Sequence, residues 1–186
     1  MSSFSIDGKR SQELGLIMLR ATKRPILPST TDRTLPIPGR AGQWDFGADL
    51  GARLFEIECA FNTKNPYELQ RRVMELAAFL VDSYGRPREV ELRFDTRPDQ
   101  YFVARYSGSL AIDRVAGLGK FTLPMMAYDP FAYGHEKIYE STIETSPFVF
   151  EIESSGNVRT NPLIVMTNHG TSTIRYFRIQ NEYRLE

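Results

Sequence analysis

The sequence predicts an α+β fold, in which an antiparallel β-sandwich or barrel-like domain carries one long helix and is followed by a partial all-β domain. One helical pattern stands out, over residues 65–85, and short strand-like runs separated by turn residues surround it. Residues 138–186 contain further β-like runs without a helical pattern. We therefore expect a first domain at residues 1–134 and a partial C-terminal domain at residues 138–186.

The sequence before the helix predicts strands and one long, proline-rich loop. Residues 3–11 have the pattern of a strand, an Asp7–Gly8 turn and a returning strand. Residues 14–22 are apolar and strand-like, and residues 52–61 form a further expected strand. Between these two runs, residues 23–51 contain four prolines. A loop of this length is unusual inside a compact domain, and such loops tend to be functional or disordered.

Capping signals and an apolar stripe predict the helix. Asn65 suits the N-cap, Pro66 suits the first turn, and Gly85 with Pro87 marks the end. One stripe of apolar residues at helical spacing comprises Leu69, Val73, Leu76, Ala77 and Leu80. The helix should therefore lie on a sheet.

Four runs after the helix predict short antiparallel strands. In residues 88–95, apolar and charged side chains alternate, which is typical of a strand with one face in water. The runs 101–108, 109–115 and 120–128 follow, with turn residues between them. Beyond residue 138 three more β-like runs occur, but they are too few for a complete sandwich. We expect that this domain is truncated or takes its remaining strands from elsewhere.

Composition and charge exclude several classes of protein. Lys+Arg and Asp+Glu both number 23, so the formal net charge is zero, which disfavours a dedicated nucleic-acid binder. The N-terminus lacks a signal-peptide pattern, and no apolar run approaches the roughly 18 residues of a membrane span. Cys59 is the single cysteine, so no intrachain disulfide is possible. It lies in an apolar run and is expected to be buried and inert.

The residues predict no catalytic, cofactor or metal site. The only histidines, His135 and His169, lie in turn-like sequences, and no serine-nucleophile motif is present. Residues 117–122, GLGKFT, resemble the end of a phosphate-binding loop, but Arg114 stands where its first glycine is required. We interpret this stretch as a hairpin turn and expect no enzymatic activity.

Three motifs, taken in order, resemble the N-terminal domain of the phage distal tail protein family. They are GKRSQELGL at 8–16, IPGRAGQWDF at 37–46 and YDPFAYG at 128–134, and the resemblance covers about residues 4–134. It implies a non-enzymatic structural protein of the virion tail tip, made in the bacterial host cytoplasm. The family forms hexameric rings that join the tail tube protein to the baseplate hub or tail-associated protein.

The resemblance also implies that residues 138–186 match the opening strands of a galectin-like domain and then stop. A host-surface or carbohydrate-binding adhesion module of a phage or prophage tail is therefore the alternative function, and such a module would need aromatic side chains displayed on one face. A hydrolase is a third class, which the missing catalytic geometry disfavours.

The segment from Thr34 to Gly47 predicts a contact with a neighbouring subunit. Two prolines limit its disorder, two glycines allow a tight reversal, and the only tryptophan offers a large apolar anchor. The interface candidates are Pro36, Pro38, Gly39, Arg40, Gly42 and Trp44. The alternative is an intrachain role, in which Trp44 and Phe46 begin a core strand and Arg40 lies in water.

Overall fold

The computed structural model describes residues 3–182. The chain divides into two units, Met1–Glu140 and Ser141–Glu186. The first unit contains every helix and strand assigned among the described residues, and it is the part that positions the candidate site.

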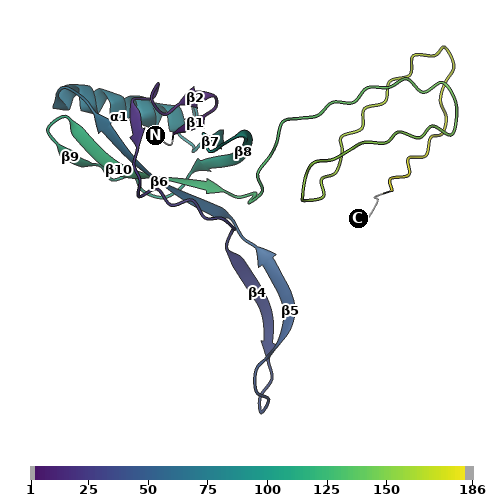
Figure 1. Cartoon of the computed structure of the whole chain (residues 1–186), viewed down its shortest axis with the longest axis horizontal. Helices are drawn as coiled ribbons and strands as arrows, with labels where there is room; N and C mark the ends of the chain where they lie inside the picture. The colour runs from purple at the N-terminus through teal and green to yellow at the C-terminus, as the bar shows by residue number, and fades with distance from the viewer. Residues whose placement is uncertain (1–2, 183–186) are drawn as a thin grey trace. The chain divides into compact units, whose positions relative to one another are not determined.

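A strongly curled antiparallel sheet forms the body of the first unit (Figure 1). Its strand order is β2-β1-β7-β8-β10-β6-β3, and β9 pairs with the start of β10. The sheet thus confirms the predicted antiparallel fold class with a single helix. Its strands are β1 (Phe4–Ile6), β2 (Lys9–Arg10), β3 (Leu16–Met18), β6 (Arg53–Asn62), β7 (Glu89–Phe94), β8 (Arg97–Tyr106), β9 (Asp113–Val115) and β10 (Leu118–Ala127).

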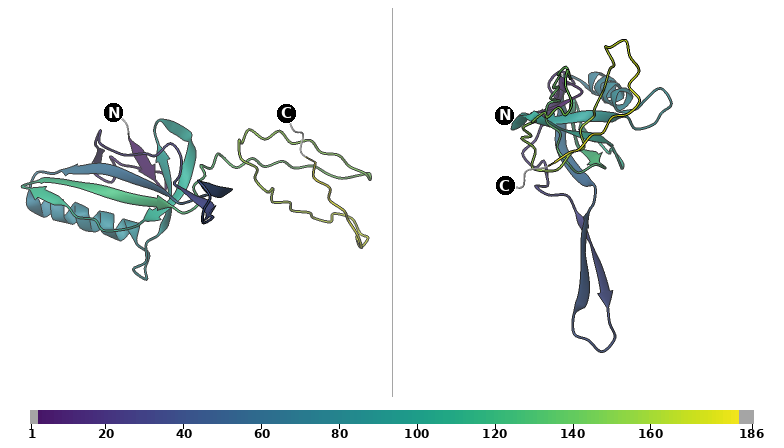
Figure 2. Two further views of the ribbon diagram at one scale, coloured as in Figure 1. Left: turned by 90° about the horizontal axis from the view of Figure 1, so that it is seen from below. Right: turned by 90° about the vertical axis from the view of Figure 1, so that its right-hand side faces the viewer.

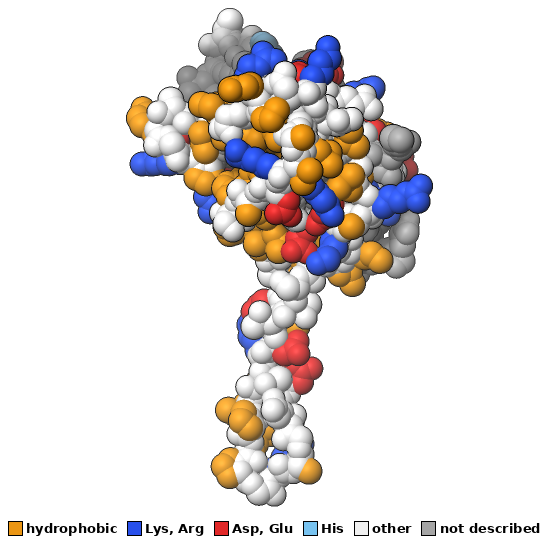
Figure 3. Space-filling view, turned by 90° about the vertical axis from the view of Figure 1, so that its left-hand side faces the viewer, with side chains coloured by type: hydrophobic (Ala, Val, Ile, Leu, Met, Phe, Trp, Pro, Cys, Tyr) orange, Lys and Arg blue, Asp and Glu red, His pale blue; other side chains and the backbone are white. Residues whose placement is uncertain are grey.

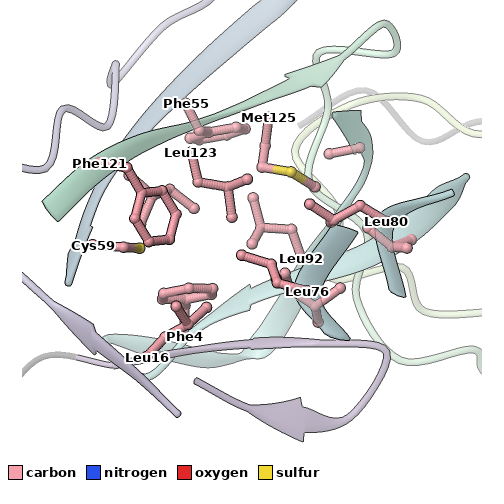
Figure 4. Packing of buried hydrophobic residues seen from close by; sticks show 14 of the residues in the cluster. Phe4, Leu16, Phe55, Cys59, Leu76, Leu80, Leu92, Phe121, Leu123 and Met125 are labelled. Carbon is pink, nitrogen blue, oxygen red and sulfur yellow. The ribbon is translucent and has the colours of Figure 1, made fainter. Parts of the chain in front are cut away.

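The core lies on the concave face of this sheet (Figure 4). β6 and β10 pair along their whole length, from Leu118 opposite Asn62 to Ala127 opposite Arg53. Because side chains alternate along a strand, every second residue of both strands points into the core. The buried residues of these two strands include Phe55, Ile57, Cys59, Phe61, Phe121, Leu123 and Met125.

The helix α1 (Pro66–Leu80) contacts β6 and β10. The side chain of Asn65 accepts a hydrogen bond from the Glu68 N–H at 2.9 Å, which confirms the predicted N-cap. The predicted end at Gly85 is wrong, because Val81 is extended and pairs with Pro87 in a β-bridge. The apolar stripe is also narrower than predicted, since Ala77 is exposed and Val73 is half-buried.

The predicted loop over residues 23–51 is a second correction. It contains a two-stranded antiparallel sheet made of β4 (Thr30–Pro36) and β5 (Gln43–Leu50), which we call the hairpin arm. All residues of both strands are exposed. Residues 43–50 do alternate apolar and polar positions as a strand does, but the prolines and glycines around them favour a loop.

The second unit contains no helix or strand among residues 141–182. The three β-like runs predicted after residue 138 are therefore not assigned as strands within the described residues. An isolated strand is not stable without a hydrogen-bonded neighbour and a covered face, and the large apolar side chains of this region are mostly exposed. The galectin-like character of residues 138–186 stays a prediction.

Gly117 marks a close backbone contact in the body. Its carbonyl accepts hydrogen bonds from the Thr63 N–H at 2.9 Å and the Thr63 hydroxyl at 2.7 Å. A Cβ atom at Gly117 would lie 2.2 Å from the Thr63 carbonyl oxygen. We expect Gly117→Ala to lower the free energy of unfolding by about 1–3 kcal/mol, because backbone must shift to relieve the overlap. Urea unfolding followed by circular dichroism measures this change.

Gly134→Ala is the matched control for this prediction, because no atom lies within 4 Å of the Cβ position at Gly134. Equal unfolding midpoints for the two variants would contradict the prediction, because they would show that the backbone at residues 63 and 117 shifts without a loss in the free energy of unfolding.

Candidate subunit interface at the hairpin arm

The hairpin arm extends away from the curled sheet (Figure 2). Its strands pair from Thr30 opposite Leu50 to Pro36 opposite Gln43, with a bulge between Asp32 and Thr34. The guanidinium of Arg33 forms a two-pronged ion pair with the carboxylate of Asp49 across the strands. Since this pair is exposed, it contributes little to stability.

The tip of the arm is a tight reversal built by proline and glycine. The Arg40 N–H donates to the Ile37 carbonyl at 3.2 Å, which closes a turn with Pro38 and Gly39 at its centre. Gly39 has a φ of 81°, as the third residue of a type II turn requires, and Gly42 has a φ of 82°. The sequence therefore folds back here for a local reason that needs no contact with the core.

Arg40 and Trp44 contact each other at the tip. The guanidinium carbon of Arg40 lies 4.1 Å from the centre of the Trp44 ring, within the range of a cation–π interaction. Trp44 stands opposite Leu35 in the strand register, so their side chains share one face of the arm. The tip thus presents an exposed tryptophan with Arg40 over its ring and Leu35 on the same face of the arm.

All six predicted interface residues lie together at this tip: Pro36, Pro38, Gly39, Arg40, Gly42 and Trp44. The intrachain alternative, in which Trp44 and Phe46 begin a core strand, is wrong. Trp44 remains 49% exposed and Phe46 66% exposed. The contact of these residues with a neighbouring subunit stays a prediction.

Four further exposed apolar residues of the arm were not among the interface candidates: Leu35, Ile37, Phe46 and Leu50. Leu35 and Ile37 lie on either side of Pro36 in the same proline- and glycine-rich segment. These two flanking apolar residues could have been identified from the sequence. Figure 3 shows hydrophobic side chains near the free end of the arm and charged side chains nearer the body. The free end is therefore the more apolar part of the arm.

Comparison with known proteins identifies the family. Residues 9–127 match the profile of the family described as the phage tail protein RIFT-related domain. The chain belongs to this family. The match includes the hairpin arm and nearly all of the curled sheet, and it confirms the resemblance seen in the motifs. No curated protein sequence matches the chain.

Among solved structures, the chain is similar to the crystal structure of the SPP1 Dit protein (gp 19.1), whose title describes a hub adsorption apparatus in phages that infect Gram-positive bacteria. The TM-score is 0.62 at 20% sequence identity, and the match covers 73% of this chain and 53% of that chain. With 53% of that chain covered, this chain spans about half the length of the Dit protein it matches. The likeness shows a shared fold.

The third motif, residues 128–134, follows the matched residues and anchors the chain near the end of the first unit. Tyr133 and Tyr101 of β8 exchange backbone hydrogen bonds at 2.8 and 2.9 Å, and their rings stack with centres 5.6 Å apart. The Tyr133 hydroxyl donates to the Asp129 carboxylate, which raises the pKa of the tyrosine. The motif thus fastens the chain alongside β8 by backbone pairing and has a structural role.

The residues considered for chemistry lie apart from one another. His135 and His169 are both exposed, and residues 3–182 contain no cluster of three or more His, Cys, Asp or Glu side chains that could hold a metal. Burial raises the pKa of the Cys59 thiol to about 12, with the nearby Glu58 charge as a second cause. Within the described part of the chain no helix is long and apolar enough to cross a bilayer.

Proposed function

We propose that the protein is a structural component of the phage tail tip, in which copies of the chain form a closed, hexameric ring between the tail tube protein and the baseplate hub or tail-associated protein. The family match supports a structural role in a phage tail. The fold shared with the Dit protein, from a hub adsorption apparatus, favours the tip of the tail. The protein would be made in the host cytoplasm and incorporated into the virion.

The hairpin arm is the observation that carries this proposal. A two-stranded hairpin is marginally stable in water by itself, and this one exposes Leu35, Trp44 and Phe46. In this proposal the partner surface belongs to another copy of the chain. The arm of one copy then meets a different surface on its neighbour, which is a heterologous contact. Repeated around an axis, such contacts close into a ring.

Oligomeric state in solution tests the proposal. Multi-angle light scattering over a range of protein concentrations should show a single assembled species in equilibrium with monomer, and negative-stain images of that species should show rings. A chain that stays monomeric up to its solubility limit, or that forms a two-fold dimer through identical surfaces, would contradict the proposal.

A further inference from the structure

At the end of the core where β6 begins, two arginines cover aromatic side chains, and we call Arg24 and Arg53 the arginine pair. Arg53 has the same strand parity as the buried Phe55, so it lies on the core face of the sheet. Its guanidinium carbon lies 5.1 Å from the centre of the Phe102 ring, and that of Arg24 lies 5.0 Å from the centre of the Phe94 ring. Both rings pack on Phe55, with centres 4.8 and 5.6 Å from its own. The two guanidiniums therefore stand over one aromatic cluster.

The arginine pair carries two charges that enter none of the ion pairs found in the described part of the chain. The Nε atom of Arg53 is buried and has no hydrogen-bond partner among the described residues, and burial lowers the pKa of its guanidinium. Arg24 donates to the neutral hydroxyl of Thr96 at 3.1 Å. The nearest acid along β6, Glu56, lies on the opposite face and pairs with Lys23 at 2.9 Å.

This arrangement suits a carboxylate. A guanidinium that stacks on a ring keeps the N–H donors at its edge available, and its planar fork matches the two oxygens of a carboxylate. A partly buried cation without a counter-charge costs free energy, which a bound anion offsets. We infer that the arginine pair binds an acidic side chain in an extended peptide segment of a partner protein. All residues of this site belong to one copy, so the inference goes beyond the proposed ring and does not depend on it.

Exposed apolar residues beside Arg24 favour a peptide over a small anion. Ile26 is 90% exposed and Leu27 74% exposed. They lie between Pro25 and Pro28, which are half-buried and whose rings fix φ, so little further order is needed on binding. A phosphate ion leaves both side chains in water, whereas a peptide with apolar residues next to its acid covers them. The formal net charge of zero supplies no general attraction for a polyanion.

Binding of a synthetic peptide to the full chain tests the inference. The probe is a fluorescein-labelled decapeptide with two adjacent aspartates between leucines, followed by fluorescence anisotropy. The control probe is the same peptide with asparagines. The aspartate peptide should bind saturably and at least about tenfold more tightly than the asparagine peptide, because only a carboxylate makes charge-assisted hydrogen bonds to the arginines.

Substitutions place the probe on the arginine pair. Arg24→Met and Arg53→Met should each weaken binding of the aspartate peptide about tenfold, through loss of one charged hydrogen-bonding group. Arg53→Lys should also weaken it, since lysine keeps the charge but lacks the fork. The matched control is Arg114→Met, because Arg114 is exposed, enters none of the ion pairs found in the described residues, and lies opposite Gly119 at the other end of β10.

Stability of the free chain gives an independent measurement. Arg53→Met keeps a long unbranched side chain over the Phe102 ring and removes a cation that lacks a partner. Its urea midpoint should therefore equal or exceed that of the original protein. A lower midpoint would show that the guanidinium serves to close the core of the free chain, and would overturn the inference.

The remaining outcomes separate this inference from the proposed function. Selective binding that the Arg24→Met and Arg53→Met variants lose and the Arg114→Met variant keeps supports the site. Equal binding of both peptides, equal loss in all three variants, or displacement of the peptide by an equal concentration of inorganic phosphate overturns it. Loss of assembly in Arg53→Met without any peptide would make a second copy the occupant, which also overturns it. A chain that binds the peptide but never assembles overturns only the ring.

Discussion

Replacing Phe61 by alanine is expected to lower the free energy of unfolding of the first unit by about 3–5 kcal/mol. Phe61 is fully buried in β6, between Leu16 of β3 and Gly119 of β10 in the strand register. Its ring stacks on Phe121 with centres 5.4 Å apart. Removal of the ring leaves a cavity at the centre of a curled sheet that cannot collapse without breaking strand pairs on both sides.

Phe46→Ala is the matched control, because it makes the same chemical change on the hairpin arm, where the side chain is 66% exposed. Its effect on unfolding should stay within about 0.5 kcal/mol. Both variants are unfolded with urea at dilutions where they are monomeric, since assembly would add to the apparent stability. Similar losses for the two variants would contradict the division between a packed body and an exposed arm.

The sequence predicts the body of the fold well because its signals are local or strictly periodic. The Asp7–Gly8 turn and the Asn65 cap depend on neighbouring residues, and the alternation in β7 depends on a sheet with one dry face. The pairing of β1 with β7 joins segments far apart in the chain, and no local pattern specifies it. The order of the strands therefore comes only from the structure.

The end of the helix shows how tertiary contacts override local signals. Gly85 and Pro87 favour a stop near residue 85, yet the chain leaves the helical conformation at Val81. There the Arg88 N–H donates to the Leu80 carbonyl at 3.0 Å, and Val81 pairs with Pro87. The turn residues that looked like a helix stop instead close a turn that leads into β7. Glycine and proline in a sequence show that the chain turns, but they do not show which helix or strand ends there.

The prolines and glycines in the sequence located the candidate site, but they did not predict that it is a β-hairpin. Prolines and glycines identified residues 36–44 as a special segment, but β4 and β5 are exposed on both faces and carry threonine, aspartate and arginine. Apolar residues alternate along β5, which is a strand signal, but β4 has no such alternation and the flanking prolines and glycines indicate a loop. The contact of Arg40 with Trp44 depends on the turn geometry at Gly39 and Gly42, which only the structure shows.

Replacing Arg40 and Trp44 together by alanine is expected to raise the dissociation constant of the assembly roughly 30- to 700-fold, which corresponds to about 2–4 kcal/mol for the loss of an aromatic anchor. Trp44 supplies apolar area on a tip whose turn is already fixed by Pro38 and Gly39, so little entropy is lost when it docks. Light scattering over a dilution series measures the change.

Tyr84→Ala with Arg86→Ala is the matched control for this last prediction. Tyr84 is 84% exposed and carries the Arg86 guanidinium 6.0 Å from its ring centre, so the pair has the same chemistry at a different place on the surface. Because the arm packs on no core residue, the Arg40 and Trp44 variant should keep the circular dichroism and unfolding midpoint of the monomer. If the arm-tip variant assembles as well as the control, the exposed tryptophan is not an anchor between subunits, and the ring must form through other edges of the sheet.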